Sequence, residues 1–248
     1  MTPLPRVVHA ETLDGLAEQD PRAMRSRRDL RRVHRIMGTC SILSRNLRAW
    51  SLPGAGPQPL RVLELGAGDG SLMLRLARVL AARWPRVELG LLDRQTLVGP
   101  DTLRQYARLG WTATPLRMDV LDWVAAAPAA AQGGDSTRRW DLIVANLFLH
   151  HFQGRQLGEL MRAAAERCDH FLACEPRRSR FALAASHLIG VLGANAVTRE
   201  DAVLSVHAGF RDRELGALWP AGEGGWATRE GPAGAFSHCF SAARTGAA

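Results

Sequence analysis

The sequence predicts an α/β protein with a doubly wound, mostly parallel sheet of seven strands. From Leu60 onwards, short apolar runs alternate with amphipathic helical stretches, which is the pattern of parallel strands joined by helices. The first apolar run ends in a cluster of glycines. Two strand-like pieces, 225–230 and 234–242, follow one another without an intervening helix, which predicts an antiparallel last strand at one edge of the sheet.

Residues 1–58 are expected to form N-terminal helices and a linker, ahead of a domain that covers residues 59–248. The lead-in 1–25 is polar, contains three prolines and predicts irregular structure. Apolar side chains then recur at helical spacing over 29–37, between arginines, which predicts an amphipathic helix against the core domain. The stretch 51–59 is rich in proline and glycine and is typical of a linker.

Five strands joined by helices are expected between residues 60 and 175. Asp101 should cap the helix after the second strand and Gly110 should end it, because these residue types favour the two helix termini. The small and polar segment 125–139 predicts a loop. The predicted strands are 60–65, 87–92, 112–116, 141–146 and 168–175, and the other helices are 71–83 and 156–167.

A helical segment over 178–225 is expected to lie on the substrate side of the domain. Helical patterns cover 178–193 and 211–219 within it. Ser205 is interpreted as the cap of a helix that folds over the open site, and the segment 33–39 as a wall on the other side. These flanks would select the substrate.

The most informative stretch is Val62-Leu-Glu-Leu-Gly-Ala-Gly-Asp-Gly-Ser71. A strand here leads through alternate glycines into a helix, so the backbone can approach a ligand closely and present helix-terminal amides to it. NAD-binding folds use a similar turn, but the nearby carboxylate of Glu64 would repel a pyrophosphate. S-adenosylmethionine instead carries an amino group and a sulfonium, so the turn favours this cofactor.

The same stretch resembles motif I of class I S-adenosylmethionine-dependent methyltransferases, and the resemblance continues along the chain. Asp93 matches the acidic position that accepts hydrogen bonds from both ribose hydroxyls in that family. Asp119 and Val120 resemble the pair at the adenine edge, although Asp119 could instead cap a helix. The resemblance implies a Rossmann-like methyltransferase fold, S-adenosyl-L-methionine as cofactor, and a cofactor site formed by Glu64, Gly66, Ala67, Gly68, Gly70, Asp93, Asp119, Val120 and Asn146.

Two candidate catalytic residues, His150 and His151, follow the fourth strand. A neutral imidazole at this place could take the proton from a phenol, an alcohol or an activated carbon during methyl transfer. A His-His pair is common at this position among the methyltransferases that the chain resembles, so a substrate-lining role is the alternative. Glu175, at the end of the fifth strand, either faces the ligand crevice or pairs with one of the arginines that follow it.

We expect an enzyme that methylates the oxygen or carbon of a small molecule, with an aromatic, phenolic or polyketide-like acceptor and no metal. The flanking segments show a looser resemblance to bacterial small-molecule methyltransferases of biosynthetic clusters. One alternative is an RNA or protein methyltransferase, which the net charge of +8 supports. All basic residues are arginines and lysine is absent, which indicates a composition bias, so a nucleic-acid partner is not expected. A second alternative is a module that binds the cofactor without catalysis.

The composition also bears on location and assembly. No apolar run approaches the roughly 20 residues that a membrane span needs, and the first residues lack the order of a secretory signal. The four cysteines show no CxxC spacing and predict neither a disulfide framework nor a zinc site. We therefore expect a cytoplasmic protein, with a homodimer as one assembly that the sequence allows.

Overall fold

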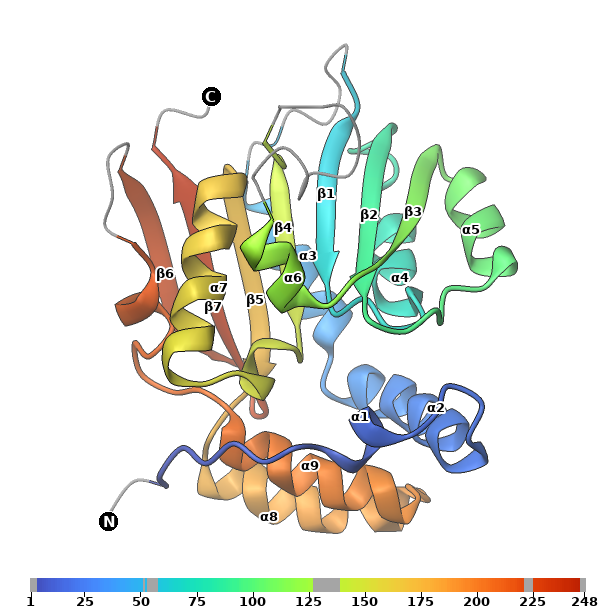
Figure 1. The fold of residues 1–248 in the computed structure, drawn as a ribbon, viewed down its shortest axis with the longest axis vertical. Coiled ribbons are helices and arrows are strands. Elements are labelled where there is room, and N and C mark those ends of the chain that lie inside the picture. Colours follow the sequence, from blue (N-terminus) through green and yellow to red (C-terminus); the bar gives the residue numbers. More distant parts are fainter. Residues whose placement is uncertain (1–3, 51, 53–57, 127–138, 221–224, 246–248) are drawn as a thin grey trace.

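The structure, a computed structural model, describes residues 4–50, 52, 58–126, 139–220 and 225–245. Its described strands form one seven-stranded sheet in the spatial order β3-β2-β1-β4-β5-β7-β6 (Figure 1). The strands are β1 (Leu60–Leu65), β2 (Val87–Asp93), β3 (Trp111–Arg117), β4 (Leu142–Asn146), β5 (His170–Pro176), β6 (Trp226–Ala233) and β7 (Ser237–Arg244).

The first five strands pair in parallel, whereas β7 runs antiparallel to both of its neighbours, β5 and β6. The predicted doubly wound sheet with an antiparallel last strand is thus confirmed. Strand β1 lies between β2 and β4, so the chain reverses its direction of winding there. In such sheets ligands bind beside this reversal, at the carboxyl ends of the strands.

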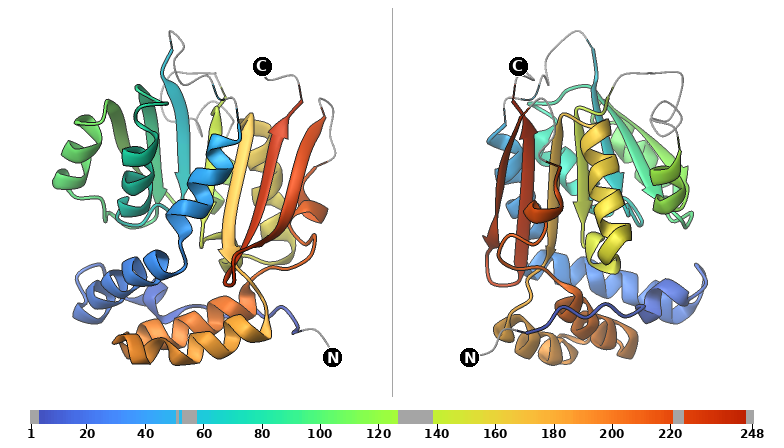
Figure 2. Two further views of the ribbon diagram at one scale, coloured as in Figure 1. Left: turned by 180° about the vertical axis from the view of Figure 1, so that it is seen from behind. Right: turned by 60° about the vertical axis from the view of Figure 1, so that its left-hand side comes forward.

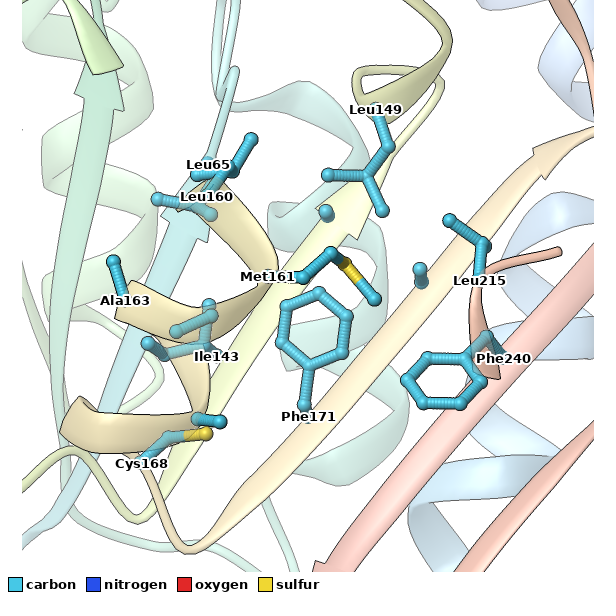
Figure 3. Close-up of a cluster of buried hydrophobic side chains, with 14 of the residues drawn as sticks. Leu65, Ile143, Leu149, Leu160, Met161, Ala163, Cys168, Phe171, Leu215 and Phe240 are labelled. Atoms are coloured by element: carbon cyan, nitrogen blue, oxygen red, sulfur yellow. The ribbon is translucent and has the colours of Figure 1, made fainter. Parts of the chain in front are cut away.

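Two apolar clusters cover the two faces of the sheet. On one face, buried residues of β1, β4 and β5 pack against α6 (Val120–Ala125) and α7 (Gly154–Arg167); Figure 3 shows Met161 and Phe171 in this cluster. On the other face, the strands pack against α3 (Thr39–Arg48), α4 (Ser71–Leu80) and α5 (Pro100–Ala107), as the view from behind shows (Figure 2). The central strands are therefore buried on both sides and hold the site residues at their ends rigidly.

A separate layer of helices lies across the carboxyl ends of the strands (Figure 1). It consists of α1 (Thr12–Gly15), α2 (Pro21–Ile36), α8 (Arg180–Leu188) and α9 (Ala196–Ala208). Asp20 caps α2 by accepting a hydrogen bond from the Arg22 amide, and Asn195 caps α9 through the Thr198 amide. Three short 3-10 helices complete the described elements: η2 (Leu149–His151), η3 (Ile189–Leu192) and η4 (Gly216–Leu218).

The N-terminal predictions were only partly right. The lead-in 1–25 is not irregular throughout, because it contains α1 and the first turn of α2. The helix expected over 29–37 exists within α2, but α2 buries Ala23, Ser26 and Asp29 and leaves the Ile36 side chain 57% exposed. The reason is that α2 packs on α9 through polar contacts, including Ser26 Oγ to Thr198 Oγ1 at 2.8 Å.

After the fifth strand, the helical pattern predicted over 178–193 corresponds to α8 and η3, but the rest of this segment differs from prediction. The segment 211–219 contains only the turn η4, and α9 was missed because its buried positions include Thr198 and Asp201 rather than an apolar stripe. Ser205 lies inside α9 instead of capping a helix. Asp101 is in the first turn of α5, whose N-cap is Gly99.

Three other expectations are not decided by the structure. Most of the predicted loop 125–139 and of the linker 51–59 lies outside the described residues. The division of the chain after residue 58 stays a prediction. Within the described ranges, no helix has the length and apolar character needed to cross a bilayer.

Candidate functional site

A cavity of about 690 Å³ opens at the carboxyl ends of β1, β2 and β4, under the helical layer. This volume lies within the range of roughly 300–1,000 Å³ that small-molecule sites usually have. Both histidines and all predicted cofactor residues except Gly70 line it. The predicted residues brought together here are Glu64, Gly66, Ala67, Gly68, Asp93, Asp119, Val120, Asn146, His150 and His151.

The glycine turn needs its glycines for backbone reasons. Gly66, Gly68 and Gly70 have φ angles of +69°, +56° and +70°, in the left-handed region that other residues rarely adopt. A Cβ atom on Gly66 would also lie only 2.2 Å from Cδ2 of Phe148. Gly70 lies at the start of α4, and its carbonyl accepts a hydrogen bond from the Tyr106 hydroxyl at 2.7 Å; its contact with a cofactor stays a prediction.

Asp93 joins the end of β2 to this turn. One carboxylate oxygen accepts a hydrogen bond from the Gly68 amide and the other from the Gln95 amide, both at 2.8 Å. Each oxygen keeps a further acceptor position, and Asp93 lines the cavity. The carboxylate is therefore held in place and can still accept hydrogen bonds from a ligand.

Two buried oxygens in the cavity wall lack a partner among the described residues. They are Oε2 of Glu64 and Oδ1 of Asn146. Burial, and then the nearby charges of Asp69 and Asp93, raise the pKa of Glu64 well above its ordinary value. A buried polar atom without a partner is costly, so this wall fits a ligand that brings hydrogen-bond donors and positive charge. The amino group of S-adenosylmethionine has both properties.

Asp119 and Val120 lie at the start of α6. Oδ1 of Asp119 accepts a hydrogen bond from the Leu121 amide at 2.8 Å, which is the helix-cap role that the sequence left open. The Val120 side chain is buried, and both residues line the cavity. Their contact with an adenine ring stays a prediction.

Glu175 organises the turn that carries the two histidines. Its fully buried carboxylate accepts hydrogen bonds from the backbone amides of Phe148, Leu149 and His150, and it contacts Nδ1 of His150 at 2.8 Å. Of the arginines that follow it, Arg178 contacts Glu214 instead. Glu175 therefore binds the 3-10 helix η2 to the end of β5.

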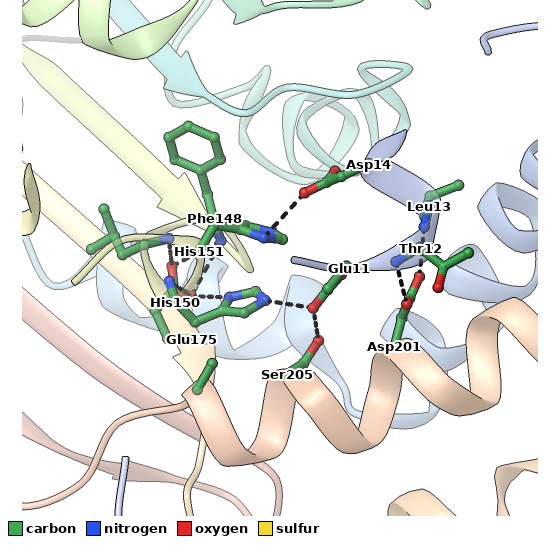
Figure 4. A network of polar contacts seen from close by, with 12 residues as sticks. Glu11, Thr12, Leu13, Asp14, Phe148, His150, His151, Glu175, Asp201 and Ser205 are labelled. Atoms are coloured by element: carbon green, nitrogen blue, oxygen red, sulfur yellow. Dashed lines mark hydrogen bonds and ion pairs between the residues drawn. The ribbon is translucent and has the colours of Figure 1, made fainter. Parts of the chain in front are cut away.

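The two histidines have different surroundings. The ring of His150 lies between Glu175 and Glu11, whose Oε1 is 3.2 Å from His150 Nε2 (Figure 4). Burial lowers the pKa of His150, but the hydrogen bonds to Glu11 and Glu175 outweigh it and raise the pKa to about 9. A histidine that keeps its proton and engages both ring nitrogens is poorly suited to act as a base. Burial lowers the pKa of His151, which is the more exposed of the pair and the better candidate.

The N-terminal segment 4–16 closes the cavity from outside, and sequence reasoning missed it. The Asp201 carboxylate accepts hydrogen bonds from the amides of Thr12 and Leu13 at 2.7 and 2.9 Å. The Arg6 guanidinium donates to the carbonyls of Ala208 and Phe152. These partners lie more than 140 residues away in the sequence, so no local pattern could indicate them.

No family model matches the chain, and no curated protein matches it in sequence. Among solved structures, an O-methyltransferase family protein from Burkholderia thailandensis superposes with a TM-score of 0.56 at 16% identity, covering 93% of this chain and 62% of that one. The chain thus spans less than two thirds of that protein. The plantazolicin methyltransferase BpumL, in complex with a pentazolic desmethylPZN analog and SAH, gives 0.60 at 11% identity and 91% coverage of both chains. The DszA carbon methyltransferase gives 0.55 at 18% identity, covering 85% of this chain and 55% of that one.

These similarities, together with the strand order, show that the chain has the class I methyltransferase fold. The resemblance seen in the glycine turn is therefore confirmed at the level of the fold.

Proposed function

We propose that this protein is an S-adenosylmethionine-dependent methyltransferase that acts on a small molecule. The observation that carries the proposal is the pair of unpartnered buried oxygens, Glu64 Oε2 and Asn146 Oδ1, beside a left-handed glycine turn. A donor-rich cation is the ligand that removes the cost of burying them. NAD, with its anionic pyrophosphate, does not match such a wall.

Each residue of the wall has a role in this proposal. Glu64 and Asn146 hold the amino-acid part of the cofactor. Asp93 accepts hydrogen bonds from the ribose hydroxyls, and Asp119 and Val120 border the adenine. When bound, S-adenosylmethionine supplies an electrophilic methyl group. Alignment of donor and acceptor in a closed cavity then provides most of the rate enhancement that this reaction needs.

The acceptor we propose is aromatic, phenolic or polyketide-like and is methylated on oxygen or carbon. The cavity wall offers Phe148 and Phe152, whose rings lie 5.2 Å apart in an edge-on arrangement, and the apolar side chain of Leu147. Aromatic side chains favour flat aromatic ligands through stacking and edge contacts. His151 lies on the same wall, where it can line the acceptor.

Calorimetric titration with S-adenosylhomocysteine, with NAD in parallel, tests the proposal. Binding of S-adenosylhomocysteine alone is expected, and Asp93→Ala should weaken it strongly. The matched control is Asp101→Ala, which removes an exposed carboxylate outside the cavity. Absence of S-adenosylhomocysteine binding, or binding of NAD in its place, would overturn the assignment. Labelled methyl transfer to a panel of phenols and polyketides then identifies the acceptor class.

A further inference from the structure

Three side chains that can bind a metal meet in the cavity wall. They are Glu11 from the N-terminal segment and the neighbouring His150 and His151 from η2 (Figure 4). One ligand atom from each lies within 4.8 Å of the ligand atoms of the other two. Ligands at about 2.0–2.1 Å from a tetrahedral zinc ion lie roughly 3.3 Å apart, so the three side chains would have to draw together around the ion.

Each imidazole has a carboxylate on its Nδ1 side. His150 Nδ1 lies 2.8 Å from Glu175, and His151 Nδ1 lies 3.3 Å from Asp14. Metal-binding histidines almost always donate their second ring N–H to a carboxylate, a carbonyl or water, which fixes the ring orientation. Two such pairs side by side match the arrangement that metal-binding histidines usually have.

The local charge also favours a cation. The carboxylates of Glu11, Asp14 and Glu175 surround two imidazoles. The guanidinium of Arg6 is near, but it contacts the backbone carbonyl of His150 rather than a carboxylate of the cluster. A divalent ion bound among these groups would offset this negative charge.

We propose that Glu11, His150 and His151 bind one divalent transition-metal ion of the zinc type. Two histidines and one carboxylate are the ligand set of catalytic zinc sites and of non-haem iron sites, both of which keep open coordination positions. The cluster lines the cavity, so the open positions face the space proposed for the acceptor. An acceptor with an oxygen donor, such as a phenol or a carboxylate, would bind there. The site departs from the metal-free enzyme expected from the sequence.

The experiment is a titration of the full chain, free of any histidine tag and treated with a chelator, with Co²⁺. We expect visible absorption bands of a bound Co²⁺ ion that saturate at one ion per chain and disappear on addition of Zn²⁺. Glu11→Gln and His151→Gln should abolish the bands. His9→Gln should keep them, because His9 is an exposed histidine that lines the same cavity outside the cluster.

Asp14→Asn provides a second, milder test, because Asp14 is partly exposed and supports the cluster through its contact with His151. Loss of such a supporting carboxylate should lower metal affinity by about 10–100-fold. Circular dichroism checks that each variant folds, and S-adenosylhomocysteine binding is measured separately on the metal-free chain, so that the two proposals can fail independently. A wild-type chain without cobalt bands, or bands unchanged in Glu11→Gln and His151→Gln, would overturn the proposed site and leave the methyltransferase proposal standing.

Discussion

At the scale of single residues, Gly66 and Gly68 form a matched pair. Both have positive φ angles, but only a Cβ on Gly66 meets another side chain, the ring of Phe148. Alanine at either position costs about 1–2 kcal/mol for the left-handed backbone. Gly66→Ala should lose about 1–3 kcal/mol more, since the Phe148 ring must move. Urea unfolding of the two variants measures this difference. An equal loss of unfolding free energy in both would show that the Phe148 ring moves aside without cost.

Glu64 should lower the stability of the folded protein and strengthen the binding of the cofactor. Its pKa is raised in the folded protein, so as the pH rises above the ordinary value of 4.5 the unfolded chain releases this proton first and the folded state loses stability. Glu64→Gln removes this loss, so the variant should exceed the wild type in unfolding free energy by a margin that grows with pH. Denaturation curves at several pH values measure the margin. A margin that is constant with pH would contradict the expectation.

The same substitution should weaken cofactor binding. Removal of a charged acceptor for the amino group costs about 1.5–3 kcal/mol, or roughly 10–100-fold in affinity for S-adenosylhomocysteine. In the wild type, binding should favour the carboxylate and release a proton, so affinity should rise with pH. Calorimetry in two buffers of different ionisation enthalpy detects that proton, and Asp101→Asn is the control. Proton uptake on binding would argue against the role of Glu64.

At the scale of elements, the sheet was predictable and the helical layer was not. Strands such as β1 were located to within a residue or two because short, mostly apolar runs ended at glycine or at a polar residue. The helix α9 was not predicted because polar residues form much of its buried side. One of these residues, Asp201, contacts the N-terminal segment. Local periodicity reports burial only where the buried residues are apolar.

The turn η2 depends on one carboxylate from another element. Glu175→Gln places an amide where three backbone N–H groups and the His150 ring now find a carboxylate. Loss of one partner of a buried pair typically costs about 3–5 kcal/mol. The control is Glu159→Gln in the exposed pair with Arg155, which should change stability little. Chemical denaturation compares the two, and similar small effects would mean that η2 does not need the charge.

At the scale of the whole molecule, the site is assembled from two layers, the strand ends of the sheet and the N-terminal segment that covers them. Only the first layer could be predicted from the sequence. Motif residues such as Glu64, Asp93 and Asn146 lie at or beside the ends of strands whose order follows from the fold, so their convergence was expected. Glu11 and Asp14 come from the N-terminal segment, and their position depends on contacts with α9 and η2. Long-range polar contacts of this kind leave no periodic signal along the chain.

This two-layer arrangement predicts that the cofactor site and the N-terminal segment are energetically coupled. Asp201→Asn replaces the carboxylate that accepts hydrogen bonds from the amides of Thr12 and Leu13 with a neutral group that has a single acceptor oxygen. Hydrogen exchange at these two amides should therefore accelerate by about tenfold or more. Saturating S-adenosylhomocysteine should slow exchange at the same two amides in the wild type, because the segment forms a wall of the ligand cavity. If the ligand protects only the glycine turn and leaves Thr12 and Leu13 unchanged, the two layers bind independently and the segment is not part of the closed site.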